Sequence, residues 1–225
     1  MSSFGLKIIA IISMLIDHTA YALYGGFSFW NYLGRLAFPI FAFQIAQGYQ
    51  HTSNLKKYFL RLFVFAILSQ IPFSFFLYTI TGEFLTLNIF FTLTLGLLSI
   101  FVFEKSPSKF LGFLFCAFCA FVASFLHMDY GYYGVLVIFL FYLFRDHKKI
   151  MVASFLLLTI LRYIPVFFNT NFYYPNIILC ICTCLAIIPI LFYNGTRGKK
   201  MTYFFYLFYP CHLALLTLLC FFVAI

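Results

Sequence analysis

The chain has 225 residues, of which 65% are hydrophobic and only 8% are charged, and its mean hydropathy is +1.05. This composition is typical of a protein made almost wholly of membrane spans and excludes a sizeable soluble domain. The formal net charge of +9 is explained by basic residues at the ends of spans and by contact with anionic lipid, so we expect no nucleic-acid partner.

Runs of about 20 apolar residues recur along the chain, which favours membrane-spanning helices, because a helix satisfies its backbone hydrogen bonds within each span. Polar interruptions divide the chain into about nine predicted spans, at 6–24, 33–50, 57–78, 87–103, 110–126, 133–145, 150–167, 175–193 and 202–224. The sixth is short, at about 13 residues, and could be tilted or half-inserted. We therefore predict an all-α polytopic membrane protein that forms a single domain over residues 1–225.

The dipeptide Asp17-His18 lies in the middle of the first span, where a charged group costs roughly 3 kcal/mol or more. Such residues normally face the interior of a helix bundle, and a histidine there can abstract a proton or accept an acyl group. We predict that this dipeptide is the reaction centre of a membrane enzyme. The alternative is a structural ion pair of Asp17 with Arg35 or Arg162. Because adjacent helical residues point about 100° apart, we expect another helix to supply the partner of His18.

The second span carries polar residues on one face that heads towards the cytoplasm. Gln44, Gln47 and His51 recur at helical spacing on this face. They could hold helices together or line an inner entry, and the sequence does not separate these alternatives. Arg35, near the other end of the span, could snorkel to the interface or line an outer cavity.

Polar residues of separate spans are predicted to share a depth, because each helical residue rises about 1.5 Å. The distances from basic anchors are roughly 16 Å for His18 from Lys7, roughly 18 Å for His212 from Lys200 and roughly 20 Å for Arg162 from Lys149. These values place the three groups just beyond the middle of a hydrocarbon core about 30 Å thick. Residues on the outer side are predicted to form an acceptor site and comprise Asn88, Asp129 and Arg162. Alternatives are a snorkelling Arg162 and a His212 that satisfies a carbonyl freed by Pro210.

Basic residues flank alternate span boundaries, which the positive-inside rule places in the cytoplasm. They are Lys7, Lys56, Lys57, Arg61, Lys105, Lys109, Arg145, Lys148, Lys149, Arg197, Lys199 and Lys200. The amino terminus is thus predicted to be cytoplasmic in a multi-pass protein of the cytoplasmic membrane. Asp17 interrupts the apolar stretch of the first span and no small-residue cleavage site follows, so we expect this segment to be retained. The seven cysteines lie within predicted spans without metal-ligand spacing, so no metal site is predicted.

Five segments of the chain resemble the TraX family, whose founding member acetylates the amino terminus of F pilin. These segments are LKIIAIISMLIDHTA, LGRLAFPIFAFQIAQGY, NIFFTLTLGLL, DYGYYGVLVIFLFYLFR and YFFYLFYPCHLALL. The layout is also distantly similar to acyltransferase-3 proteins and to the lysosomal glucosamine acetyltransferase. The resemblance implies a transmembrane acyltransferase-like bundle in which His18 is the first candidate for catalysis, followed by Asp17, Arg35 and His212.

The same resemblance implies acetyl-CoA as the acyl donor and an amine or hydroxyl of a peptide, glycan or small molecule as the acceptor. The basic residues expected to bind the phosphates of CoA from the cytoplasm are Lys56, Lys57, Arg61, Lys199 and Lys200. The main alternative is a proton-coupled transporter or flippase, because buried Asp, His and Arg also describe such carriers. A non-catalytic membrane scaffold is a third alternative.

Overall fold

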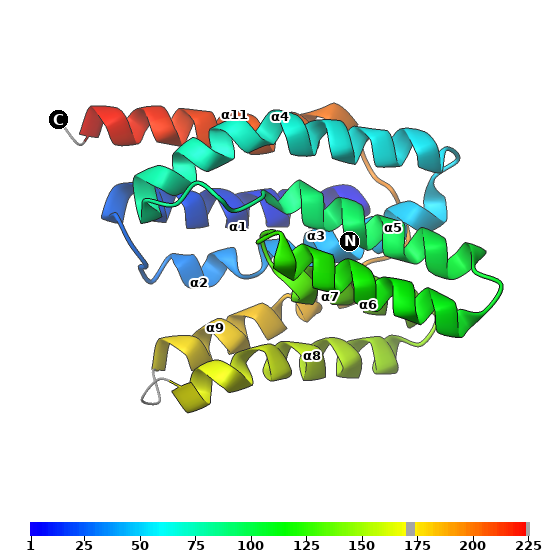
Figure 1. Ribbon diagram of the computed structural model, residues 1–225. Coiled ribbons are helices and arrows are strands. Elements are labelled where there is room, and N and C mark those ends of the chain that lie inside the picture. The colour runs from blue at the N-terminus through cyan, green and yellow to red at the C-terminus, as the bar shows by residue number, and fades with distance from the viewer. Residues whose placement is uncertain (170–173, 224–225) are drawn as a thin grey trace. The chain divides into compact units, whose positions relative to one another are not determined.

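The computed structural model describes residues 1–169 and 174–223, and within these ranges the chain forms eleven helices and no strand (Figure 1). The helices are α1 (Ser3–Tyr24), α2 (Asn31–Gly34), α3 (Ala37–His51), α4 (Leu55–Thr81), α5 (Ile89–Lys105), α6 (Lys109–Phe125), α7 (Gly131–Leu143), α8 (Lys148–Asn169), α9 (Tyr174–Leu185), α10 (Ile187–Leu191) and α11 (Thr202–Val223). The prediction of an all-α fold is therefore confirmed.

Each predicted span coincides with helix, but two of the nine are interrupted. The span predicted at 33–50 is divided into α2 and α3, and the span predicted at 175–193 into α9 and α10. A proline lies in the first turn of the second helix in both cases, Pro39 in α3 and Pro189 in α10. Proline cannot donate to the carbonyl four residues earlier and its ring clashes with it, whereas the first turn of a helix tolerates proline. The prolines thus explain why new helices start there.

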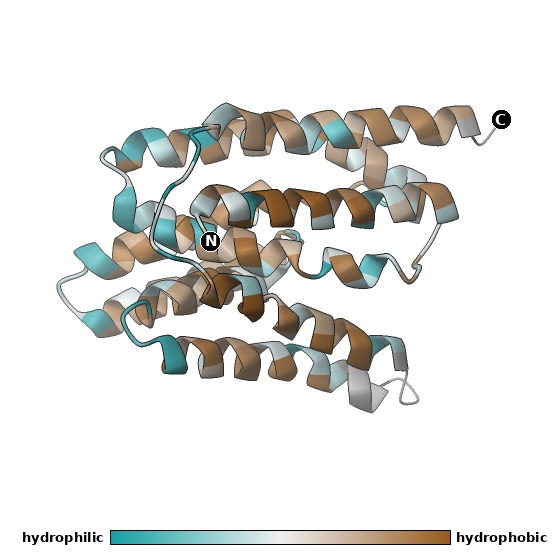
Figure 2. Ribbon diagram, turned by 180° about the vertical axis from the view of Figure 1, so that it is seen from behind, coloured by the Kyte–Doolittle hydropathy of each residue, from teal (hydrophilic) through white to brown (hydrophobic). Residues whose placement is uncertain are grey.

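Three of the described helices are long and apolar enough to cross a membrane: Ser3–Tyr24, Leu55–Thr81 and Thr202–Phe222. Shorter apolar helices occupy Lys109–Phe125, Gly131–Leu143 and Pro175–Leu191. Figure 2 shows that the helices are mostly hydrophobic and that hydrophilic residues gather near helix ends and in connecting segments. The chain thus has the character of a helical membrane protein, while the total of nine spans and the cytoplasmic amino terminus stay predictions.

The chain divides into two compact units, one formed by residues 1–41 and 152–225 and the other by residues 42–151. In the first unit, α1 packs against both α2 and α11, and α2 contacts α9 (Figure 1). In the second unit, α5 packs against α4, α6 and α7. The prediction of one functional domain over the whole chain stays a prediction.

Two glycines allow helices of the second unit to approach closely. A methyl group on Gly96 of α5 would lie 2.4 Å from Ile138 Cδ1 of α7, and one on Gly112 of α6 would lie 2.8 Å from Phe103 Cα of α5. Both distances are below van der Waals contact, so the absence of a side chain at each position is required for this packing.

Candidate functional site

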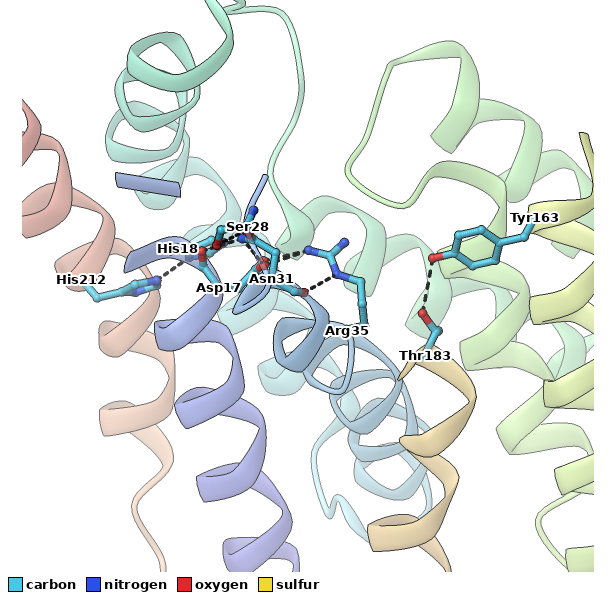
Figure 3. Close-up of polar contacts among 8 residues, drawn as sticks. All are labelled: Asp17, His18, Ser28, Asn31, Arg35, Tyr163, Thr183 and His212. Atoms are coloured by element: carbon cyan, nitrogen blue, oxygen red, sulfur yellow. Dashed lines mark hydrogen bonds and ion pairs between the residues drawn. The ribbon is translucent and has the colours of Figure 1, made fainter. Parts of the chain in front are cut away.

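A pair of histidines joins the two ends of the sequence within the first unit. Nδ1 of His18 on α1 lies 2.8 Å from Nε2 of His212 on α11 (Figure 3). The two rings are nearly coplanar, with an angle of 8° between them and 5.1 Å between their centroids. This geometry is that of an in-plane hydrogen bond between imidazoles. Helical rise predicts that both residues lie at one level, and the structure brings them into direct contact.

The protonation of the histidine pair follows from the second hydrogen bond of His212. Nδ1 of His212 lies 2.7 Å from the carbonyl oxygen of Phe208, which can only accept, so Nδ1 must carry the hydrogen. In a neutral pair, Nε2 of His212 is then the acceptor and Nδ1 of His18 the donor. The lone pair of His18 is consequently on Nε2, the ring nitrogen on the other side of the imidazole.

The ring of His212 is held on several sides by its own helix. Phe208 stacks on it with 4.8 Å between centroids, and Tyr209 lies edge-on at 5.7 Å. Pro210 has no amide hydrogen to donate to the carbonyl of Tyr206, four residues earlier. His212 bonds the carbonyl of Phe208 and not that of Tyr206, so the predicted alternative for His212 is not the arrangement found. His212 is buried, with 7% of its surface exposed, and His18 is only partly buried. Of the two residues, His18 is therefore the more exposed.

Asp17, the neighbour of His18, bonds a different helix. Its carboxylate oxygens lie 3.0 and 2.9 Å from Nη2 of Arg35, and Oδ1 also accepts from the side-chain amide of Asn31 at 2.8 Å. Arg35 additionally donates from Nε to the carbonyl of Asn31. The structural alternative for Asp17, an ion pair with Arg35, is thus the arrangement that the structure contains. We call Asp17, Asn31 and Arg35 the Asp17 cluster.

The Asp17 cluster depends on a sharp turn and a close helix contact. α1 ends at Tyr24 and is capped by Gly25, whose φ of +63° is left-handed backbone that glycine adopts readily. The chain then returns so that α2 lies against α1. A methyl group on Gly34 would lie 2.3 Å from Cβ of Asp17, so only glycine permits this approach.

Asn31 was missed in the sequence because it precedes the start of the predicted second span. It is fully buried, and all of its side-chain polar atoms are used. Its oxygen accepts from the amide and hydroxyl of Ser28, and its NH₂ group donates to the backbone carbonyl and carboxylate of Asp17. The signal available in the sequence was the spacing Ser28-x-x-Asn31 directly after a glycine turn, which is typical of a local cap.

The predicted acceptor-site residues lie in both units. Arg162 is on α8 of the first unit and is half-buried. The hydroxyl oxygen of the next residue, Tyr163, lies 3.4 Å from Oγ1 of Thr183 on α9 (Figure 3). Asn88 belongs to the second unit and directly precedes α5, where its side-chain oxygen accepts from the amide of Phe90 and its NH₂ group donates to the carbonyl of Ala66 and to Gln70. The structure therefore gives Asn88 a structural role that the sequence did not indicate.

The remaining predicted residues are distributed between the units as well. Asp129 is partly exposed, and its carbonyl accepts from Oγ1 of Thr92 in the second unit. The basic residues expected to bind CoA are exposed at Lys56, Lys57, Lys199 and Lys200 and half-buried at Arg61. The first two and Arg61 belong to the second unit, and Lys199 and Lys200 to the first. That these five basic residues bind CoA stays a prediction, as does the acceptor role of Asp129.

Chemically, the histidine pair can receive a proton at Nε2 of His18 and pass one from Nδ1 of His18 to Nε2 of His212. The resulting charge on His212 would be stabilised by the carbonyl of Phe208. Such an arrangement suits general-base or nucleophilic catalysis. Among the described residues, no group of three or more His, Cys, Asp or Glu side chains is arranged to hold a metal ion.

A protein-family model and one relative each match nearly the full length of the chain. A protein-family model described as "TraX protein" matches residues 2–220. A protein of Dichelobacter nodosus described as "Probable fimbrial assembly protein FimC, serogroup H1" is 30% identical over 237 aligned positions, which cover 96% of this chain and 94% of that protein. An uncharacterized protein of Rickettsia prowazekii is 33% identical over 113 positions, covering 49% of this chain and 41% of its own length. No solved structure matches the chain significantly.

Proposed function

Because the chain belongs to the TraX family, we propose that it is an integral-membrane acyltransferase that moves an acetyl group from cytosolic acetyl-CoA to an amine or hydroxyl acceptor. The observation that carries this proposal is the hydrogen bond between His18 and His212 on neighbouring helices. It supplies a neutral imidazole whose lone pair is directed away from its partner, which is what a base for acyl transfer needs.

In the proposed reaction, Nε2 of His18 removes a proton from the acceptor as the acceptor nitrogen or oxygen attacks the thioester carbonyl. The proton on Nδ1 of His18 shifts towards Nε2 of His212, which spreads the positive charge over the pair. The carbon–sulfur bond then breaks, and the thiolate takes the proton back as free CoA. Acceptor and acetyl group leave joined by a new amide or ester bond, and both histidines return to the neutral state.

A second route uses the same pair but forms a covalent intermediate. Nε2 of His18 attacks the thioester, its Nδ1 proton passes to His212, and the thiolate leaves with that proton as CoA. The acceptor nitrogen or oxygen then attacks the acetyl carbonyl, the bond from Nε2 of His18 to the acetyl carbon breaks, and the acceptor's proton returns to His18, which regains its neutral form. Trapping of labelled acetyl-histidine after rapid acid quenching distinguishes this route from direct transfer.

The Asp17 cluster has a positioning role in this proposal. Arg35 uses Nε and Nη2 to bind Asn31 and Asp17, so it holds the middle of α1 against α2. This contact fixes the rotation of α1 about its axis and thereby the direction of the adjacent His18 ring.

The acceptor to test first is the amino group of a fimbrial subunit. The support is the description of the Dichelobacter nodosus relative as a probable fimbrial assembly protein. Glycans and small amines or alcohols are the other acceptor classes that the same chemistry would serve.

The test is incubation of the purified protein with acetyl-CoA labelled in the acetyl group, with release of CoA and transfer of label both measured. We expect His18→Ala to lower the rate by roughly 100-fold or more, in line with the loss of a general base. His147→Gln is the matched control, because His147 is an exposed histidine of the second unit. Normal turnover by His18→Ala would exclude the proposed mechanism.

The same assay addresses the transporter alternative. A proton-coupled carrier would neither release CoA nor retain label, yet its His18→Ala variant would lose substrate uptake in proteoliposomes. Absence of any acetyl chemistry in the wild-type protein, combined with such uptake, would replace the acyltransferase proposal.

A further inference from the structure

A small basic recess lies where α1 and α11 begin. Four of its lining residues are cationic, namely Lys7, Arg197, Lys199 and Lys200, and the rings of Phe4 and Phe205 form part of its wall. None of the residues that line it is acidic. Because like charges repel, such a recess is most stable when an anion occupies it.

The segment that carries three of these cations is fixed to the start of α1 through backbone atoms. The amide of Ser3 donates to the carbonyl of Thr196 at 2.8 Å, and the amide of Phe4 donates to the carbonyl of Arg197 at 3.1 Å. Gly198 has a φ of +68°, and a methyl group there would lie 2.5 Å from Oγ of Ser2. The recess is therefore built by the main chain, and the basic side chains are not needed to hold this segment in place.

Lys7 adds a cation from inside the first helix. It is half-buried, and its ammonium lies 5.5 Å from the centroid of the Phe205 ring, within the range of a cation–π contact. α11 begins at Thr202, which also lines the recess, so the positive end of a 22-residue helix adds to the field.

We propose that this recess binds a phosphate group. Phosphate is a compact anion with several acceptor oxygens, and it suits a mixed set of lysine and arginine donors. Resting on the proposed function, we assign this group to the 3′-phosphate of the acyl-CoA donor. A phospholipid headgroup offers the same chemistry and is distinguished by the experiment below.

The position of the recess fits a CoA donor. The recess is lined by residues at the start of α1 and of α11, and the histidine pair joins residues further along the same two helices. The two helices run in the same direction (Figure 1). By helical rise, His18 lies about 16 Å along α1 from Lys7. In CoA, the pantetheine arm separates the phosphates from the thioester, so phosphates held at the recess allow the thioester to extend towards His18.

The experiment measures the affinity of free CoA and of 3′-dephospho-CoA for the protein in phosphatidylcholine nanodiscs. Free CoA has no acyl group, so binding is read without any contribution from catalysis. The test variant is Arg197→Gln with Lys199→Gln. The matched control is Lys148→Gln with Lys149→Gln, which removes the same charge from exposed positions at the start of α8.

We expect wild type and control to bind CoA about tenfold more tightly than 3′-dephospho-CoA, in line with charge-assisted hydrogen bonds to one phosphate. The test variant should bind both compounds equally, while its melting temperature in these nanodiscs should match that of the wild type. A second outcome is that all three proteins bind CoA and 3′-dephospho-CoA equally, while phosphatidylglycerol raises the melting temperature of wild type and control but not of the test variant. That outcome would support the phosphate site and assign it to a lipid headgroup.

If all three proteins had equal affinity for CoA and phosphatidylglycerol changed none of their melting temperatures, the proposal that the recess binds phosphate would be overturned. That outcome would leave the acyltransferase proposal to the His18→Ala assay, because turnover and CoA binding are measured separately. Conversely, loss of CoA discrimination in the test variant would support the recess even if the wild type transferred no acetyl group.

Discussion

Asp17 and His18 are adjacent in the sequence, yet each bonds a different helix. His18 meets His212 on α11, whereas Asp17 binds Asn31 and Arg35 around α2. Successive helical residues point about 100° apart, so neighbouring positions serve two separate interfaces. At the scale of single residues, catalysis and structure can therefore be tested independently, although both depend on the middle of α1.

His212 is predicted to act through His18 rather than on the substrate. In His212→Gln, the amide oxygen can still accept from Nδ1 of His18, whereas His212→Leu offers no acceptor. We expect kcat to fall about tenfold in His212→Gln. In His212→Leu the fall should be larger and approach the roughly 100-fold expected when the base is missing. KM should change little in either variant. Steady-state kinetics measures this split, and equal turnover of the two variants would contradict the role of the hydrogen bond.

Gly34→Ala is predicted to separate α1 from α2. The new methyl group would lie 2.3 Å from Cβ of Asp17, and relief of such a clash typically costs about 1–3 kcal/mol. We expect a lower melting temperature in detergent and reduced acyl transfer. Gly26→Ala is the control, because nothing lies within 4 Å of a methyl group there and its backbone is not left-handed. The close contact would be refuted if the two variants melted alike.

At the scale of elements, hydrophobic runs predicted the helices closely, with α1, α6 and α11 each starting or ending within a few residues of the predicted spans. The interruptions at Arg35 and Ala186 were not predicted, because Arg35 lies near the end of its predicted span and Ala186 lies in apolar sequence. Pro39 and Pro189 could have indicated both interruptions, because proline restricts the backbone and favours the first turn of a helix. The cap formed by Asn88 was also missed, since the sequence suggested an acceptor site.

Asn88→Ala is predicted to destabilise the start of α5. It removes a fully buried cap and leaves the carbonyl of Ala66 without this donor, at a cost of about 1–3 kcal/mol. Asn54→Ala is the matched control, an exposed cap of α4 that should cost less, about 0.5–1 kcal/mol. Unfolding in mixed micelles with increasing SDS measures both. An unchanged midpoint together with a raised KM for the acceptor would instead support the acceptor-site prediction.

At the scale of the whole molecule, helical rise predicted a depth for each polar residue but not its neighbours around the bundle. It placed His18, His212 and Arg162 at one level, and only the fold shows that α11 supplies the partner of His18. Asn31 escaped detection because it lies outside the predicted spans, although its burial completes the Asp17 cluster. Spacing from basic anchors thus predicted that His18 and His212 lie at one level along their helices, whereas lateral contacts depend on packing between distant segments.

Sidedness is the prediction that joins topology to chemistry. Basic clusters such as Lys56 with Lys57 and Lys199 with Lys200 are predicted to be cytoplasmic, so the phosphates of acetyl-CoA should be bound from that side. Acetyl-CoA added outside should therefore support turnover in sealed inverted vesicles and not in right-side-out vesicles. Reporter fusions in the segments 79–87 and 104–109, expected outside and inside respectively, establish the orientation independently. Equal turnover in both kinds of sealed vesicle would require donor access from either face and would contradict the prediction that acetyl-CoA binds from the cytoplasmic side only.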